Sequence, residues 1–118
     1  MSTRQKDCLF CKIALGEMDT EFLFEDEEIV AFKDINPMAP VHILIVPKKH
    51  IPTVNRIAET DTELVGNLIM VARKMAENQN IAEEGYRLVF NCGEKGGQEV
   101  QHLHLHLLGG RQMKWPAG

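Results

Sequence analysis

The sequence lacks the features that mark membrane, secreted and nucleic-acid-binding proteins. Among its 118 residues, no apolar run approaches the roughly 20 residues that a membrane-spanning helix needs. The opening residues MSTRQKD contain no signal-peptide core. A net charge of −4 disfavours a general nucleic-acid binder, since surfaces that follow a phosphate backbone are usually basic. We therefore expect a cytoplasmic protein with no membrane contact and no nucleic-acid binding, although a small nucleotide could occupy a local pocket.

Cysteine is also scarce. Three cysteines, an odd number, favour reduced thiols or metal ligands over a disulfide framework. Hydrophobic residues make up 44% of the chain and charged residues 25%, which is enough apolar material for one core. No repeat, linker or low-complexity segment divides the chain, so we expect one domain over residues 1–118.

Two segments have helical patterns. Asp7 is placed to cap a short helix over about residues 8–15, which Gly16 ends. Thr60 and Glu63 form a capping-box pattern, which opens a longer helix running to about residue 80. Apolar residues recur at helical spacing along the longer helix and predict a packed face: Leu64, Leu68, Val71 and Met75.

Five short apolar runs are expected as strands. Acidic residues separate the first two runs, which indicates a hairpin, and glycines separate the last two. The runs are residues 22–25, 29–32, 42–47, 86–91 and 102–108. Because the connections are mostly hairpin-like, the sequence predicts an α+β fold, an antiparallel sheet with its helices on one side.

Residues 102–108 read HLHLHLL, so three of the five histidines occupy alternate positions. On a strand, His102, His104 and His106 would share one face, while the leucines between them pack into a core. Same-face neighbours lie about 6.5–7 Å apart and zinc–nitrogen bonds are about 2 Å, so one ion can hardly gather all three. We interpret the rings as having separate roles around an anion, one as nucleophile and others as donors. The alternative is a hydrogen-bonded polar strand face.

A glycine-rich loop precedes these histidines. Gly93, Gly96 and Gly97 allow positive φ and close approach of the backbone to a ligand. Exposed N–H groups in such a loop can hold phosphate oxygens. An ordinary flexible turn is the alternative.

The pattern H-x-H-x-H followed by two apolar residues resembles the signature of the histidine triad (HIT) superfamily of nucleotide hydrolases and transferases. Similarity extends through AFKDINPMAPVHILIVPKKH, GYRLVFNCGEKGGQEVQHLHLHLLGG and the closing GRQMKWPAG. These segments resemble the Hint branch, the histidine triad nucleotide-binding proteins, in the bacterial type that has a CxxC zinc motif. The resemblance implies a HIT-like fold, with a five-stranded antiparallel sheet and two helices.

The resemblance also implies a homodimer with a ten-stranded sheet. The central helix and the strand at 86–91 would form the contact, although the apolar face of that helix could equally pack within one subunit.

The resemblance assigns roles to four polar residues. His104 corresponds to the nucleophile that attacks the α-phosphorus, and His106 to the histidine that contacts the phosphate. His42 matches an upstream histidine near the nucleophile, and Asn91 an asparagine near the phosphate and ribose; without the resemblance, hydrogen bonding at strand ends would explain both. Many close relatives have serine where this chain has Glu99, which affects how the leaving amine is protonated.

The nucleoside is expected in an apolar slot with an acid for the ribose hydroxyls. Asp34 corresponds to that acid, and the slot to residues that could also be simple core: Phe10, Ile13, Phe32, Ile35 and Leu44. The resemblance adds further binding positions, the last of which would reach the neighbouring subunit's site: Gly97, Gln98, Glu99, Val100 and Trp115.

Cys8 and Cys11 form a C-x-x-C pair, a spacing that lets two thiolates share one zinc ion. The resemblance completes the ligand set with His50 and His102, which implies a structural zinc and no catalytic cofactor. The alternatives are two buried reduced cysteines or a redox pair, although the βαβ context of a thioredoxin motif is lacking.

The implied activity is hydrolysis of purine nucleoside phosphoramidates through a nucleotidyl-histidine intermediate. Expected ligands are AMP, GMP and adenosine phosphoramidate. Two alternatives remain: a dinucleoside polyphosphate hydrolase, and a nucleotide-binding or scaffolding protein with little catalysis.

Overall fold

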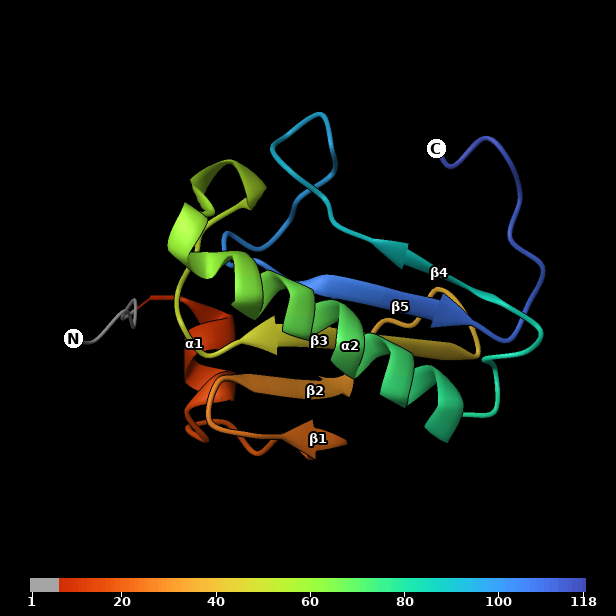
Figure 1. The fold of residues 1–118 in the computed structure, drawn as a ribbon, viewed down its shortest axis with the longest axis horizontal. Coiled ribbons are helices and arrows are strands. Elements are labelled where there is room, and N and C mark those ends of the chain that lie inside the picture. The colour runs from red at the N-terminus through yellow and green to blue at the C-terminus, as the bar shows by residue number, and fades with distance from the viewer. Residues whose placement is uncertain (1–6) are drawn as a thin grey trace.

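The computed structural model describes residues 7–118 (Figure 1). Five strands form one antiparallel sheet in the order β1-β2-β3-β5-β4, as expected. The helices are α1 (Leu9–Ala14) and α2 (Thr62–Asn78), and the strands are β1 (Phe24–Glu25), β2 (Ile29–Lys33), β3 (Val41–Pro47), β4 (Tyr86–Val89) and β5 (Leu105–Gly109). None of the described helices is long and apolar enough to cross a membrane.

The two helices lie on opposite faces of the sheet, so the expectation of both on one side is wrong. α2 covers the face to which Ile43 and Ile45 of β3 point, whereas α1 covers the face of Leu44 and Val46 (Figure 1). Alternate residues of one strand point to opposite sides, so a strand that is apolar throughout needs cover on both. The core under α2 is the larger one and includes the whole predicted helix face: Leu64, Leu68, Val71 and Met75.

The caps of α1 differ from the prediction at one end. Cys8, and not Asp7, is the N-cap, and its sulfur accepts the amide N–H of Cys11 at 3.4 Å. At the other end Gly16 has φ 78°, and its N–H donates to the carbonyl of Ile13, which closes the helix as expected.

The start of α2 is also corrected. Thr60 lies in a 3₁₀ turn (Glu59–Asp61), and Asp61 is the N-cap of the helix. The Asp61 carboxylate accepts the amide N–H of Ala58 at 2.9 Å and the ammonium of Lys49 at 2.6 Å. The Asp61 carboxylate therefore stabilises this turn, whereas the sequence pattern had assigned the start of the helix to Thr60 and Glu63.

The histidine-rich segment enters the sheet later than predicted. β5 begins at Leu105, so only His106 of the three histidines lies in the regular strand. The preceding chain turns away because the N–H of Leu103 donates to the carbonyl of Ile51 at 2.6 Å. The intervening leucines are nevertheless buried in the core under α2: Leu103, Leu105 and Leu107. β4 likewise ends at Val89, two residues before the predicted end.

We expect Asp61→Ala to lower the free energy of unfolding by about 1 kcal/mol, which is a fall of about 4 °C in Tm, because the hydrogen bond to the Ala58 amide and the ion pair with Lys49 are lost. Hydrogen bonds from Lys49 and Ala58 hold the Asp61 pKa below its ordinary value of 3.8. The stabilisation is thus present above pH 3.8 and lost as pH falls through the lower native pKa. Thermal melts at pH 7 and at pH 2.5 check this. Glu59→Ala, at an exposed position of the same turn, is the control, and an equal loss there would contradict the assignment.

Candidate functional site

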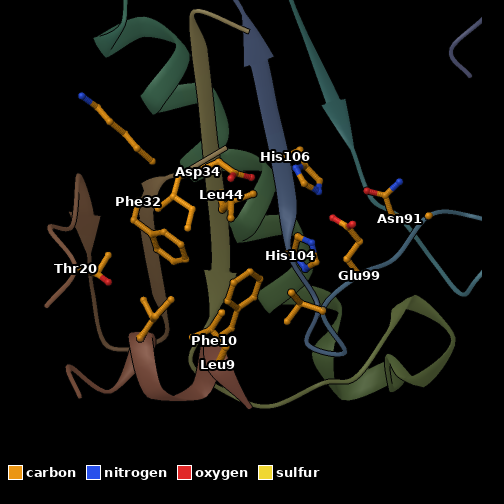
Figure 2. Close-up of a pocket in the computed structure, with 15 residues that line it drawn as sticks. Leu9, Phe10, Thr20, Phe32, Asp34, Leu44, Asn91, Glu99, His104 and His106 are labelled. Carbon is orange, nitrogen blue, oxygen red and sulfur yellow. The ribbon is translucent and has the colours of Figure 1, made fainter. Parts of the chain in front are cut away.

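A cavity of about 260 Å³ opens on the face of the sheet that carries α1 (Figure 2). Its walls come from α1, β2, β3, the glycine-rich loop and the segment entering β5. Twelve of the residues singled out from the sequence line it: Phe10, Ile13, Phe32, Asp34, Ile35, Leu44, Asn91, Gly97, Glu99, Val100, His104 and His106. Rings and aliphatic side chains occupy one end of the cavity, and polar groups gather at the other: His104, His106, Glu99 and Asn91.

His104 is held in one tautomer by its own neighbour. Its Nδ1 lies 2.7 Å from the carbonyl oxygen of His102, which can only accept, so Nδ1 carries the proton. Nε2 therefore carries the lone pair. The ring of Phe10 meets that of His104 edge to face, with 5.0 Å between centroids, and fixes its plane. The geometry makes His104 a neutral, oriented nitrogen nucleophile at the cavity wall.

His106 presents the opposite nitrogen chemistry. The amide N–H of Met38 donates to Nδ1 of His42 at 3.0 Å, so the proton of neutral His42 sits on Nε2. That Nε2 lies 2.9 Å from Nδ1 of His106, which must then accept. When His42 donates to it, His106 carries its own proton on Nε2 and is a hydrogen-bond donor. The rings of His104 and His106 are 4.9 Å apart, so a nucleophile and a donor stand side by side.

Burial keeps these imidazoles uncharged. It lowers the pKa of His106 to about 4, with further lowering from His104 and His42. Burial also lowers the pKa of His104 and of His42, although Asp34 counteracts part of the effect on each. All three rings are therefore neutral at pH 7, as a nucleophile with a free lone pair requires.

The glycine-rich loop is shaped by its own hydrogen bonds. Gly97 has φ 79°. A Cβ on Gly96 would lie 2.3 Å from the carbonyl oxygen of Cys92, so only glycine fits there. Asn91 Nδ2 donates to the Gly96 carbonyl at 2.7 Å, which ties the loop to the end of β4. The loop thus borders the polar end of the cavity with its backbone.

Three of the residues predicted to bind or act on the nucleotide do not line the cavity. His42 lies behind His106 and is 7% exposed. Gln98 is buried, and its side-chain amide bonds Thr53, Gly93, Pro52 and Val100, so it braces the loop.

Trp115, the third, is 85% exposed in the C-terminal tail.

Three lining residues were missed by sequence reasoning. Leu9 neighbours Phe10 on α1, and Lys33 lies between two residues that the resemblance had identified. For Lys33, its position in the sequence between Phe32 and Asp34 was the available signal. Thr20 lies in an irregular segment between α1 and β1, where no pattern could have indicated it.

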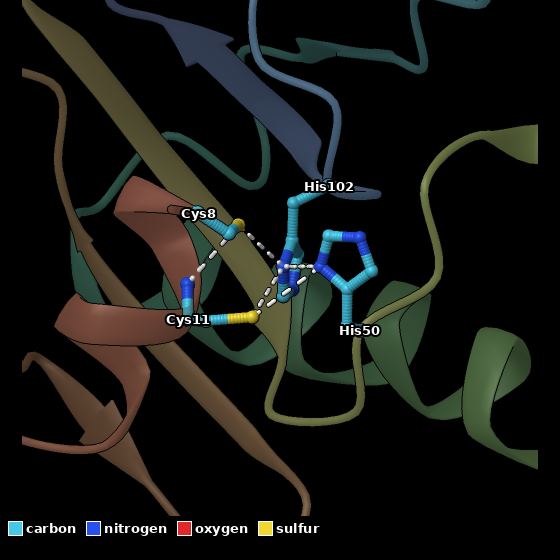
Figure 3. Close-up of side chains that lie close together, drawn as sticks. All are labelled: Cys8, Cys11, His50 and His102. Atoms are coloured by element: carbon cyan, nitrogen blue, oxygen red, sulfur yellow. Dashed lines mark hydrogen bonds between the residues drawn. The ribbon is translucent and has the colours of Figure 1, made fainter. Parts of the chain in front are cut away.

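A second cluster joins α1 to the segment before β5. Cys8, Cys11, His50 and His102 converge side chain to side chain (Figure 3). Nδ1 of His102 lies 3.3 Å from the Cys8 sulfur and 3.1 Å from Nδ1 of His50, and the Cys11 sulfur lies 3.3 Å from the latter nitrogen. Nε2 of His102 donates to the carbonyl of Pro47 at 2.8 Å, so its lone pair faces the other three ligand atoms.

These four residues fit a zinc ion. Two sulfurs and two imidazole nitrogens directed at one point are the donor set of a closed tetrahedral zinc site. Burial lowers the pKa of His102 to about 4, which keeps its nitrogen available as a ligand. The expected ligand set is thus assembled by the fold from three separate segments.

The chain is similar to other proteins over most of its length. Residues 7–116 match the family model described as "Scavenger mRNA decapping enzyme C-term binding". The purine nucleoside phosphoramidase of Escherichia coli K12 is 46% identical over 108 residues, which is 92% of this chain and 91% of that protein.

Solved structures agree. A HIT family hydrolase from Legionella pneumophila Philadelphia 1 has a TM-score of 0.93 at 57% identity, covering 95% of this chain and all of that one. A histidine triad family protein from Mycobacterium smegmatis, described as zinc-bound, has a TM-score of 0.78 at 28% identity, covering 89% and 76% of the two chains. By sequence, by fold and by the arrangement of its histidines, this chain belongs to the histidine triad superfamily.

Proposed function

We propose that this protein hydrolyses the P–N bond of purine nucleoside phosphoramidates. The observation that carries the proposal is the hydrogen bond from Nδ1 of His104 to the His102 carbonyl. This bond leaves the lone pair on Nε2 of His104, a neutral ring that lines the cavity. The similarity to a purine nucleoside phosphoramidase supports the substrate class.

The reaction proceeds in two displacements at phosphorus. Nε2 of His104 forms a bond to the α-phosphorus as the P–N bond breaks, and the amine departs with a proton. Glu99, a cavity-lining carboxyl beside His104 in Figure 2, gives the amine this proton and takes one back from the attacking water in the second step. Water then cleaves the phosphorus–nitrogen bond to His104, which releases the nucleoside monophosphate and restores the ring.

The remaining lining residues bind and orient the nucleotide. His106 donates from Nε2 to a phosphate oxygen, beside the backbone of the Gly97 loop. Phe10 and Phe32, whose rings pack edge to face at 5.8 Å, flank the apolar slot for the base. Asp34, at the cavity wall, accepts hydrogen bonds from the ribose hydroxyls.

We expect His104→Ala to lower kcat/KM for adenosine phosphoramidate about a thousandfold or more, because the nucleophile is removed. Mass spectrometry of wild-type enzyme quenched during turnover should find an AMP adduct on the peptide containing residue 104. Binding of AMP by the variant, measured by calorimetry, is the control.

The same assays separate the alternatives. Faster turnover of diadenosine polyphosphate than of the phosphoramidate would indicate a polyphosphate hydrolase. AMP binding without turnover of either compound by the wild type would indicate a binding module.

We propose that zinc bound by Cys8, Cys11, His50 and His102 is structural. Its ligands tie α1 and the segment after β3 to the chain that enters β5, and a site closed by four protein ligands holds no substrate. The ion would thereby fix the position of the His102 carbonyl that orients His104.

Cys11→Ser is expected to remove one equivalent of zinc and to lower Tm by about 10 °C, since metal binding free energy is folding free energy. Metal analysis and thermal melts measure the two effects. Cys92→Ser is the matched control: Cys92 accepts a hydrogen bond from Thr53 outside the cluster and should leave zinc and Tm unchanged. Full zinc content in Cys11→Ser would refute the ligand assignment.

We also propose a homodimer in which β4 of each copy joins the sheets into one of ten strands. β4 is an edge strand, and α2, which packs on the neighbouring strands β5 and β3, exposes Ile69 and Met70 at 44% and 47%. An open sheet edge and exposed apolar side chains on the helix that covers the same sheet are features suited to contact with a second copy.

Met70→Asp should shift the dimer to monomer in sedimentation velocity runs, because a charge replaces an apolar contact. Arg73→Asp, an exposed charge change on the same helix, should leave the dimer intact. A wild type that sediments as a monomer would refute the dimer.

A further inference from the structure

One proton in this site faces two acceptors. Nε2 of His42 lies 2.9 Å from Nδ1 of His106 and 3.4 Å from Oδ2 of Asp34. Nδ1 of His42 is engaged by the amide N–H of Met38, which can only donate. Neutral His42 therefore has a single N–H, on Nε2, for both neighbours.

His42 itself is out of reach of a ligand. Its side chain is 4% exposed, and it lies behind the cavity wall, whereas both of its acceptors line the cavity. Asp34 has 21% of its side chain exposed and also accepts the N–H of Asn36 at 2.8 Å through Oδ1, which leaves Oδ2 for a ligand or for His42. Any influence of His42 on substrate must then pass through Asp34 or His106.

The state of Asp34 decides where the His42 proton goes. A carboxylate with no ligand attracts the N–H by its charge, despite the longer distance. When hydroxyl groups donate to Oδ2, that attraction falls and the N–H is directed at Nδ1 of His106. His106 then keeps its own proton on Nε2, where it donates to phosphate.

We propose that His42 is a positioning residue that couples ribose recognition at Asp34 to the hydrogen-bond donor that His106 offers to the phosphate. The identity of the substrate in this coupling rests on the proposed function, whereas the hydrogen-bond geometry does not. The coupling makes ribose hydroxyls contribute to the rate of the chemical step and not only to binding. A ribose bound at Asp34, whose Oδ2 lies 3.4 Å from Nε2 of His42, changes which nitrogen of His106 carries the proton.

The kinetic test compares adenosine phosphoramidate with its 2′-deoxy analogue in wild type and in His42→Leu. We expect the 2′-deoxy change to lower kcat about tenfold in wild type, a coupling of ordinary size. In His42→Leu, kcat with the ribo substrate should fall and the ribo-to-deoxy ratio in kcat should approach one, while the effect on KM persists. An equal kcat ratio in both proteins would overturn the coupling.

His42→Gln is the matched variant. The glutamine amide offers an oxygen to the Met38 amide and an N–H to His106, so it should restore part of both kcat and the ratio that leucine removes. If glutamine and leucine behave alike, the N–H of His42 has no such role.

A second readout does not depend on turnover. Nitrogen NMR of ¹⁵N-histidine-labelled wild-type protein with AMP bound should show protonated Nε2 on His42 and His106 and protonated Nδ1 on His104. With 2′-deoxy-AMP, the His106 signals should shift towards a mixture of tautomers. A proton on Nδ1 of His106 with AMP bound, or a divalent ion held by Asp34, His42 and His106, would overturn the proposal.

The two proposals fail in different ways. If the wild type turns over neither phosphoramidate but shows the expected protonation of its histidine nitrogens, the proposed function is refuted and the coupling stands. Turnover with an unchanged kcat ratio in His42→Leu keeps the function and loses the coupling.

Discussion

The site depends on the bend of the chain just before β5, at His102. There the Leu103 N–H donates to the Ile51 carbonyl and not to a neighbouring strand. The backbone carbonyl of His102 and its imidazole ring can therefore serve different purposes. Its carbonyl accepts the proton of His104 at 2.7 Å, while its ring turns to Cys8, Cys11 and His50. A regular strand through this segment would have kept the His102 carbonyl in the ladder or in solvent, and the three rings in one row.

The two faces of the sheet have different roles. The face under α2 buries most of the large apolar side chains and supplies the stability, whereas the face under α1 carries the cavity. α1 is only six residues long, yet it gives Phe10 to the cavity and Cys8 and Cys11 to the metal cluster. A helix this short is marginal by itself, so its position depends on packing and on the cysteine cluster.

Two adjacent imidazoles have opposite tautomers, and backbone groups impose both. The His102 carbonyl places the proton of His104 on Nδ1. The Met38 amide, acting through His42 when the His42 N–H is directed at His106, places the proton of His106 on Nε2. Burial keeps the rings neutral by lowering their pKa values, so each presents one defined nitrogen. Identical side chains thereby perform opposite roles, one giving an electron pair and the other a hydrogen bond.

The sequence by itself determined the five strands, the two helices and the helix ends at Gly16 and near residue 80, because these follow from local periodicity and turn chemistry. Motif spacing singled out the alternating histidines and the CxxC pair, and the family resemblance supplied the other residues of both clusters. It could not place the two helices on opposite faces, move the α2 cap to Asp61 or start β5 at Leu105. Those outcomes depend on contacts between residues far apart in the chain, such as Leu103 with Ile51 and Lys49 with Asp61. The direction of each histidine proton, on which the chemistry depends, was decided by the tertiary structure alone, since it is set by whichever backbone group the fold brings against the ring.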